Sequence, residues 1–241
     1  MDIKGKNVLI TGAGKRIGRN LALNLAKEGA NLILHYHSSE KEIKEVEDLV
    51  KSYQVKVLSL KADLTDMKDV YFLIKESLIF FRKVDILINN ASVYYPTPLD
   101  TVKEEDLDLF YLVHVKAPFF LSKELGRLMY ENKEGRIINI VDYAPLRPYK
   151  DFTPYAVSKG AMLTMTRAFA KELAPYVLVN AILPGPIVPA EDLDDLEKPL
   201  KKTLLKKWAG EKEVWKGVKY LIETDFTTGA FLPVEGGRLI C

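Results

Sequence analysis

The chain has 241 residues, of which 48% are apolar, so it is long enough to bury a sizeable core. It carries 35 Lys and Arg against 33 Asp and Glu, a net charge of +2 with the two signs well mixed, which gives no reason to expect a nucleic-acid or membrane partner. The single cysteine, Cys241, excludes an internal disulfide framework. No apolar run approaches the roughly 20 residues that cross a bilayer, and no signal region precedes the first apolar run, so we expect a cytoplasmic protein.

Short apolar runs alternate with longer amphipathic segments along the whole chain. The apolar runs predict seven strands, at 7–11, 31–36, 55–60, 84–89, 136–141, 177–182 and 230–234. The segments between them predict helices, including 17–29, 104–130, 154–173 and 212–222. Continuous apolar strands alternating with helices are typical of a doubly wound α/β parallel sheet with helices on both faces. Without a repeat or a linker-like stretch, we expect one domain over 1–241.

A glycine-rich turn, TGAGKRIG at 11–18, joins the first strand to the first helix. Glycines there permit a tight turn and let backbone N–H groups approach a pyrophosphate at the helix N-terminus. The spacing is one residue longer than G-x-G-x-x-G between Gly14 and Gly18, and a plain turn is the alternative. Its position between strand and helix favours nucleotide binding.

The end of the second strand lacks the Asp or Glu that usually binds the ribose 2′-hydroxyl of NAD. It reads His35-Tyr36-His37-Ser38-Ser39 instead, and Arg16 in the glycine turn is placed opposite it. A guanidinium with hydroxyl and imidazole donors suits a 2′-phosphate, so we expect NADPH. For His35, packing in the core is the better interpretation. For His37, binding the 2′-phosphate is preferred to a plain surface position.

Asp63 and Leu64 follow the third strand. The carboxylate of Asp63 is equally suited to accept a hydrogen bond from an adenine amino group or to cap the next helix.

Several motifs stand in the order and approximate spacing of the short-chain dehydrogenase/reductase family. They are TGAGKRIG, ADL at 62–64, NNAS at 89–92, Tyr155-x-x-x-Lys159 and Pro184-Gly185. The likeness runs from about Lys6 to Gly237, and the ordered set is far more specific than any single motif. The resemblance implies a Rossmann-like NADP(H)-binding enzyme. It assigns cofactor contacts to Gly12, Lys15, Arg16, Ile17, Gly18, Tyr36, His37, Ser38, Ser39, Asp63, Leu64, Asn90, Ala91, Ser92, Tyr155, Lys159, Pro184, Gly185 and Ile187.

Departures from the family pattern resemble its pteridine reductase branch, which includes dihydromonapterin reductases. Arg16 stands where the family usually has glycine, Asp142 where it has serine, and His114 where it has a helix asparagine. The stretches LHYHS at 34–38, NNASVYYPTPL at 89–99 and the C-terminal part from Pro199 to Gly237 are also similar to that branch. The resemblance implies substrate contacts by Arg16, Ser92, Tyr94, Asp142 and Tyr155.

Tyr155 and Lys159 are four residues apart, so they share one face of a helix. A neighbouring ammonium favours the phenolate and moves the tyrosine pKa from about 10 toward neutrality. The resemblance makes both catalytic, with Lys159 also on the nicotinamide ribose. The alternative is a packed tyrosine and a solvated lysine.

Asp142 is the residue that narrows the substrate. An ionised carboxylate cannot donate a hydrogen bond to a ketone oxygen, as the usual serine does. Reduction of a pterin C=N bond instead requires a proton at a ring nitrogen, which an acid can supply. Enclosure would raise the pKa of Asp142 enough to carry that proton. A cap on the loop after the strand is the alternative.

Three functions stay open at this point. The first is an NADPH-dependent reductase of a dihydropterin or dihydrofolate-like compound, the second a 3-oxoacyl or other carbonyl reductase, and the third a non-catalytic NADP(H)-binding regulator. His114 is either part of a proton relay or a hydrogen-bonded core histidine. We expect a substrate lid at 189–210 and no metal. Family analogy suggests a homotetramer or homodimer through helices that carry Phe110, Tyr111, Phe119, Phe120 and Phe169, and the alternative is that the same residues serve the core.

Overall fold

A computed structural model describes residues 1–189, 195–197 and 199–241. Seven parallel strands form one sheet in the order β3-β2-β1-β4-β5-β6-β7. The strands are β1 (Asn7–Ile10), β2 (Asn31–Tyr36), β3 (Val57–Lys61), β4 (Ile86–Asn89), β5 (Gly135–Ile140), β6 (Val177–Pro184) and β7 (Phe231–Val234). Each predicted strand is present, with ends displaced by up to two residues.

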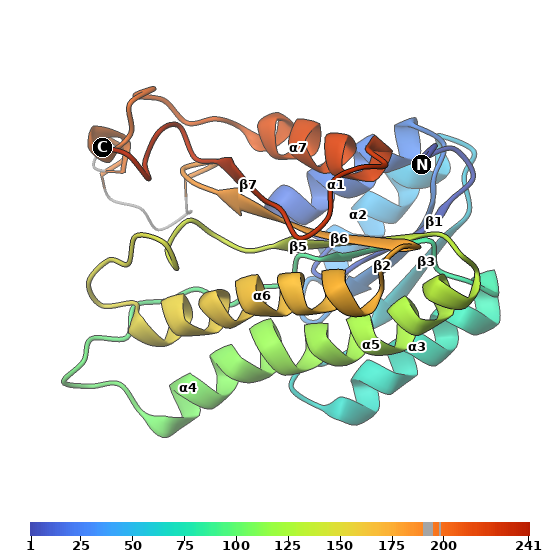
Figure 1. Cartoon of the computed structure of the whole chain (residues 1–241), viewed down its shortest axis with the longest axis horizontal. Coiled ribbons are helices and arrows are strands. Elements are labelled where there is room, and N and C mark those ends of the chain that lie inside the picture. Colours follow the sequence, from blue (N-terminus) through green and yellow to red (C-terminus); the bar gives the residue numbers. More distant parts are fainter. Residues whose placement is uncertain (190–194, 198) are drawn as a thin grey trace.

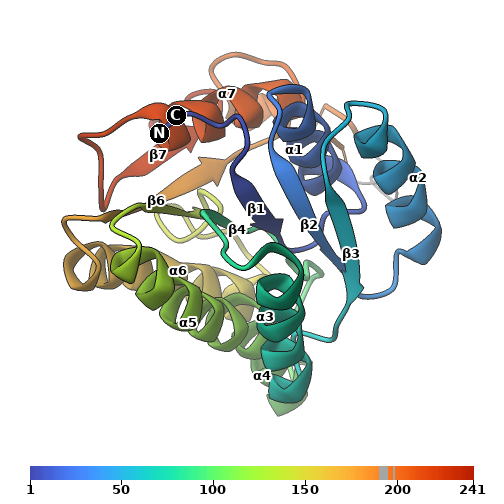
Figure 2. The same cartoon turned by 90° about the vertical axis from the view of Figure 1, so that its right-hand side faces the viewer.

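Helices cover both faces of this sheet, as Figures 1 and 2 show. They are α1 (Arg16–Lys27), α2 (Glu40–Lys51), α3 (Met67–Phe81), α4 (Glu104–Tyr111), α5 (Ala117–Glu131), α6 (Thr153–Glu172) and α7 (Glu211–Glu223), with short turns η1 (Leu112–Lys116) and η2 (Leu200–Lys202). One apolar core packs α3, α5 and α6 against the sheet, and a second packs α1, α2 and α7 against the other face. The predicted doubly wound α/β fold is confirmed.

The strand order reverses between β1 and β4, because the chain crosses from one half of the sheet to the other there. Ligands of open α/β sheets bind at the carboxyl ends of the strands beside such a reversal. The glycine turn after β1 and the NNAS segment after β4 meet at this point.

The predicted helix over 104–130 is interrupted, which corrects the sequence interpretation. Residues Leu112–Lys116 form a π-helical turn, closed by the N–H of Ala117 on the carbonyl of Leu112. Pro118 accounts for the interruption, since it has no N–H for the carbonyl of His114 and its ring displaces that carbonyl. The inserted residue directs His114 into the protein, where it is 0% exposed.

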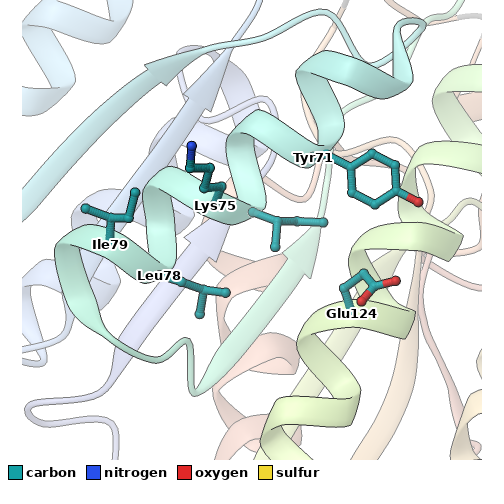
Figure 3. Close-up of a pocket in the computed structure, with 6 residues that line it drawn as sticks. Tyr71, Lys75, Leu78, Ile79 and Glu124 are labelled. Carbon is teal, nitrogen blue, oxygen red and sulfur yellow. The ribbon is translucent and has the colours of Figure 1, made fainter.

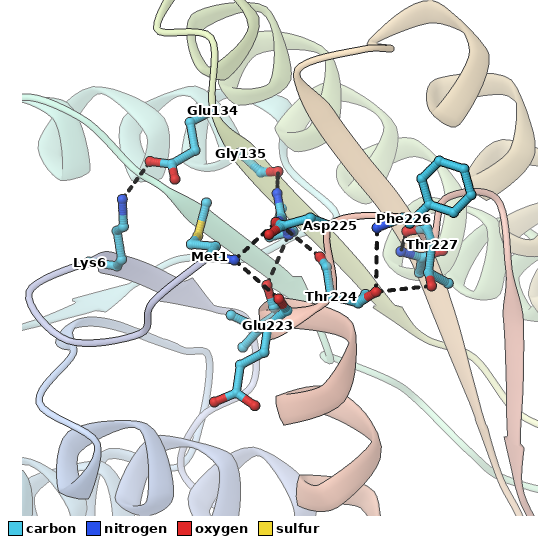
Figure 4. Close-up of polar contacts among 12 residues, drawn as sticks. Met1, Lys6, Glu134, Gly135, Glu223, Thr224, Asp225, Phe226 and Thr227 are labelled. Carbon is cyan, nitrogen blue, oxygen red and sulfur yellow. Dashed lines mark hydrogen bonds and ion pairs between the residues drawn. The ribbon is translucent and has the colours of Figure 1, made fainter.

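Arg136 ties the start of β5 to the end of α7. Its guanidinium, 4% exposed, donates to the carbonyls of Gly135, Ile222 and Thr224 at 3.0 Å each, and to Asp225 at 2.6 Å. Figure 4 shows the amino group of Met1 reaching the same carboxylate. The carboxylate of Asp225 therefore joins the chain's first residue to Arg136 and to the end of α7. Within the described ranges, no helix combines the length and apolar character that crossing a bilayer requires.

Candidate active site

The glycine turn is pressed against the ends of β2 and β4. Gly12 adopts a φ of +66°, and a Cβ there would lie 2.9 Å from the Cα of Ala91. A Cβ at Gly18 would lie 2.1 Å from the carbonyl oxygen of Gly12, and one at Gly14 would lie 2.5 Å from the Oγ of Ser39. Larger residues would therefore push the turn out of place. The N-terminus of α1 has no side-chain cap, so its N–H groups suit an anionic group.

The buried ring of His35 fixes the glycine turn through a hydrogen bond. Its Nδ1 accepts from the N–H of Gly12 at 3.0 Å, so its Nε2 carries the proton and donates to the carbonyl of Ala62 at 3.0 Å. The ring is 2% exposed, and burial lowers its pKa to about 4. The interpretation of His35 as a packed strand residue is confirmed.

Arg16 lies elsewhere than predicted. Its guanidinium donates to the carbonyls of Val188 and Pro189 at 2.9 and 3.1 Å, on the loop after β6, rather than toward the end of β2. Its φ of +48° is left-handed, which explains why glycine suits this position. The cation that does face the start of α2 is Lys15, whose Nζ lies 2.8 Å from Glu42.

Asp63 does not cap α3, so that alternative was wrong. Asp66 caps the helix by accepting from the N–H of Lys68 at 2.8 Å. Asp63 instead accepts from the N–H and the hydroxyl of Thr65, and its other oxygen lies 3.8 Å from the Nε2 of His37. Leu64 is buried in the core.

The NNAS segment clamps the glycine turn. The side-chain amide of Asn90 donates to the carbonyls of Thr11 and Gly12, both at 2.9 Å. The N–H groups of Asn90 and Ala91 donate to the Oγ1 of Thr11. Ser92 comes next and bonds His114 at 2.9 Å. The segment thus connects the glycine turn with the helices on the other side of the cleft.

Asp142 and Tyr155 come together in the cleft, as the sequence predicted. Asp142 follows β5, and Tyr155 lies in the first turn of α6. The Tyr155 hydroxyl donates to the Oδ2 of Asp142 at 3.0 Å, and the N–H of Ala144 donates to Oδ1 at 2.6 Å. Asp142 therefore caps the loop after β5, which is the alternative interpretation given for this residue.

The pKa values of this pair move in the same direction. Burial raises the pKa of Asp142 to about 6, as expected from enclosure, while Lys159 and Arg238 act to lower it. Burial, and then the charge of Asp142, raise the pKa of Tyr155 well above its usual 10. The predicted net lowering of the tyrosine pKa is therefore wrong.

Lys159 is 1% exposed, so the alternative of a solvated lysine is excluded. Its Nζ donates to the carbonyl of Ile140 at 3.1 Å and lies 5.8 Å from the ring centroid of Tyr155. Burial lowers its pKa to about 8, against the attraction of Asp142. The site therefore holds one acid and one base whose pKa values lie on either side of neutrality.

Aromatic rings pack beside Asp142 and Tyr155. Tyr94 is 55% exposed and stacks on Phe152 at 4.7 Å, with its edge toward Tyr155 at 5.0 Å. Tyr149 packs against Phe152 at 5.1 Å. Tyr95 instead stacks on Phe110 and donates to Asp106, so it serves packing. The exposed ring of Tyr94, near the carboxyl of Asp142, is a surface on which a flat substrate can stack.

Arg238, from the tail after β7, is a site residue that sequence reasoning missed. Its guanidinium lies 4.9 Å from the ring centroid of Tyr143 and donates to the carbonyl of Pro199. Burial raises the pKa of both Asp142 and Tyr94, and the charge of Arg238 acts against that rise, so the guanidinium lies near both groups. No local motif indicates this residue, because its position depends on how the tail folds back.

The loop after β6 is fixed at several points. A Cβ at Gly185 would lie 2.6 Å from the Cα of Glu235, so only glycine fits there. The carbonyl of Ile187 accepts from the N–H of Gly210 at 2.8 Å. Of the predicted lid at 189–210, residues 190–194 and 198 lie outside the described residues. The described part includes η2, which the C-terminal tail contacts through the thiol of Cys241 on the carbonyl of Lys202.

A surface hollow of about 560 Å³ lies apart from all of these residues. It is lined by Tyr71, Ile74, Lys75, Leu78 and Ile79 of α3 and by Glu124 of α5, as Figure 3 shows. None of the predicted site residues contributes to it.

Comparison with known proteins gives the family. Residues 6–197 match the short chain dehydrogenase family. The chain is 32% identical to an L-rhamnose 1-dehydrogenase (NADP(+)) of Thermoplasma acidophilum, over 100% of this chain and 98% of that one. It is 33% identical to a dihydromonapterin reductase of Shigella boydii, over 96% and 95%. A crystal structure of a blue fluorescent protein from a metagenomic library, in complex with NADPH, superposes with a TM-score of 0.93 at 28% identity, over 99% of each chain. The chain is therefore an NAD(P)-dependent oxidoreductase that belongs to the short-chain dehydrogenase family.

Proposed function

We propose that the protein reduces the C=N bond of a dihydropterin or dihydrofolate-like substrate with NADPH. The observation that carries this proposal is the carboxyl of Asp142 on the hydroxyl of Tyr155, 3.0 Å away, with its pKa raised to about 6. When ionised, this carboxyl repels a developing oxyanion. When it is protonated, this carboxyl can donate a proton to the ring nitrogen of the substrate.

The two residues act as one proton-donating unit. Tyr155 holds its proton firmly, because burial and Asp142 raise its pKa. Asp142 is the member whose pKa lies near the working pH, so it donates to the ring nitrogen directly or through Tyr155. Lys159 keeps a positive charge beside the pair and limits how far the pKa of Asp142 rises.

The residues at the carboxyl edge fit a dinucleotide. The glycine positions leave space that any Cβ would fill, and the N-terminus of α1 is uncapped. We assign the pyrophosphate to Gly12–Gly18, the nicotinamide ribose to Lys159, and the carboxamide to the loop of Pro184, Gly185 and Ile187. When bound, the cofactor supplies a hydride.

The preference for NADPH is supported by the segment from Tyr36 to Ser39, which carries no acid. Ser39 lies against the glycine turn at Gly14, and His37 is exposed at the same edge. Lys15, whose Nζ lies 2.8 Å from Glu42, is a cation of the glycine turn on the side of α2, where Arg16 was expected. Two of the relatives described above, one an NADP(+) enzyme and one solved with NADPH, agree with this preference.

We assign the flat pterin ring to the exposed side chain of Tyr94, and further substrate contacts to Ser92 and Arg16. The dihydromonapterin reductase relative supports the substrate class, while the rhamnose dehydrogenase relative supports carbonyl chemistry. We choose the pterin class of substrate because an ionised Asp142 would repel the oxyanion that forms in carbonyl reduction.

We further propose one domain, a cytoplasmic location and a homodimer or homotetramer. Of the five aromatic residues on those helices, Phe110 and Phe169 are buried within the chain and so serve its core, as the alternative interpretation has it. Tyr111 and Phe119, 52% and 43% exposed, are available to a second copy.

One assay tests the proposal. Purified protein is given NADPH with dihydrobiopterin, dihydromonapterin, dihydrofolate or a 3-oxoacyl thioester, and NADPH oxidation is followed. We expect turnover of at least one pterin at a kcat/KM above that of the thioester. Turnover of the thioester without any pterin would overturn the proposal, and tight NADPH binding without any turnover would favour a regulator.

A further inference from the structure

His114 lies at the centre of the contact between the NNAS segment and α6. It comes from the π-helical turn before α5, it is 0% exposed, and its ring lies 5.6 Å from that of Tyr155. Its Nε2 faces Ser92 and Val93, and its Nδ1 faces Ser158. One buried ring therefore links the NNAS segment and Val93 to α6, the helix that carries Tyr155.

The hydrogen bonds fix which nitrogen carries the proton. The N–H of Val93 points at Nε2 from 3.2 Å and can only donate, so Nε2 is the acceptor. The hydroxyl of Ser158 donates to the carbonyl of Tyr155 at 2.8 Å, so its oxygen is left to accept from Nδ1, also 2.8 Å away. Neutral imidazole with the proton on Nδ1 satisfies the hydrogen bonds to Val93 and Ser158. The hydroxyl of Ser92 lies 2.9 Å from Nε2 and 3.3 Å from the carbonyl of Val93, and its one proton serves one of these acceptors at a time.

A second proton on this ring would be costly. The second proton would lie on Nε2 and face the N–H of Val93. The hydrogen bond from Val93 to Nε2 would then be replaced by a repulsion between two N–H groups. Burial and the charge of Lys159 on α6 hold the pKa of His114 well below its usual value. Tyr155, the other titratable group in contact with the ring, is itself held neutral. A residue in a proton relay must gain and lose a proton. The ring of His114 already holds one proton and has no favourable position for a second proton.

We infer that His114 is a neutral positioning residue, locked with its proton on Nδ1, which sets Ser92–Tyr94 against the first turn of α6 and relays no proton. The proton that Tyr155 gives up in turnover then has to be restored through Asp142, the hydrogen-bonded partner of its hydroxyl.

The direct test is long-range ¹H–¹⁵N correlation NMR of the labelled full-length protein, with and without NADPH. The spectrum of a His114→Asn variant identifies the His114 signals among those of the three histidines. We expect a protonated Nδ1, an unprotonated Nε2, and no change between pH 8 and pH 5.5. A proton on Nε2, or a doubly protonated ring within that range, would overturn the inference.

Two variants separate positioning from relay in kinetics, and this arm rests on the proposed pterin reduction. His114→Asn keeps a donor at the level of Nδ1 for Ser158 but leaves Val93 and Ser92 without their acceptor. We expect KM for the pterin to rise about tenfold, as for one buried hydrogen bond lost, with kcat and the shape of its pH profile retained.

His114→Gln is the matched variant, since it keeps an acceptor at the level of Nε2 and loses the bond to Ser158. We expect its KM to stay closer to that of the wild type. A large loss of kcat in both variants with an altered pH profile would indicate a relay and contradict the inference. The NMR measurement needs no substrate, so a failure of pterin turnover would refute the proposed function and leave this inference to be decided by NMR alone.

Discussion

Replacing Asp142 by Asn removes the acid of the site, whose pKa of about 6 lies near neutrality. Asn has the same shape and can still accept from the N–H of Ala144. It cannot release a proton. If Asp142 is the acid, proton delivery to the substrate nitrogen is lost while the geometry is retained.

The size of the effect follows from the raised pKa. At pH 7 a carboxyl with a pKa of about 6 is protonated about one time in ten, whereas a carboxyl at 3.8 is protonated less than one time in a thousand. Burial thus makes the proton available roughly a hundredfold more often. A positioned acid contributes about 10²–10⁴ to the rate, so we expect kcat/KM for the pterin to fall by that factor.

The assay is kcat/KM against pH from 5 to 9. The protonated form of Asp142 is the active one, so the wild type should be most active below pH 6 and lose about tenfold per pH unit above it. The Asn variant should lack this inflection and still bind NADPH.

Asp151→Asn is the matched control, because it makes the same change on the same loop at a φ of +66°, which Asn tolerates. We expect it to behave as the wild type. A wild-type rate in the Asp142 variant, or an unchanged inflection, would refute the reasoning.

Three other outcomes follow from the geometry. Arg238→Met removes a charge that lowers the pKa of Asp142, so the pH at which activity falls should move upward; a midpoint that stays or moves down in the pH profile would contradict this. His37→Asp places a carboxylate at the end of β2 and should reduce the kcat/KM ratio of NADPH over NADH by about tenfold or more, and an unchanged ratio would locate the selectivity elsewhere. Arg136→Met leaves three carbonyls without their donor and should cost about 3 kcal/mol, a Tm lower by roughly 6–12 °C in thermal denaturation. Arg127→Met, at an exposed ion pair, is its control and should change stability by about 0.5 kcal/mol or less.

The sheet was predictable because its strands are continuous apolar runs separated by helical periodicity. Strand ends were less certain, since β6 continues to Pro184 and β3 begins only at Val57. The π-helical turn was missed, although Pro118 inside a helical segment is a signal of interruption. Periodicity alone does not say how a helix adapts to such a proline.

The site was predictable where short spacings decide it. The glycine turn, the NNAS segment and the pairing of Asp142 with Tyr155 lie where the motifs place them. The pKa of Tyr155 was not predictable, because the four-residue spacing to Lys159 says nothing about burial or about an acid arriving from β5. Arg238 depends on the path of the tail, so it was missed for the same reason.

The central claim is that hydride goes to a ring C=N bond and that Asp142 supplies the proton. The most direct measurement uses NADPH deuterated at the transferable position with dihydromonapterin, and locates the deuterium in the product by NMR. The proposed function predicts one deuterium on the carbon of the former C=N bond in the tetrahydropterin. An unlabelled pterin, together with deuterium on the carbinol carbon when a 3-oxoacyl thioester is offered, would contradict it.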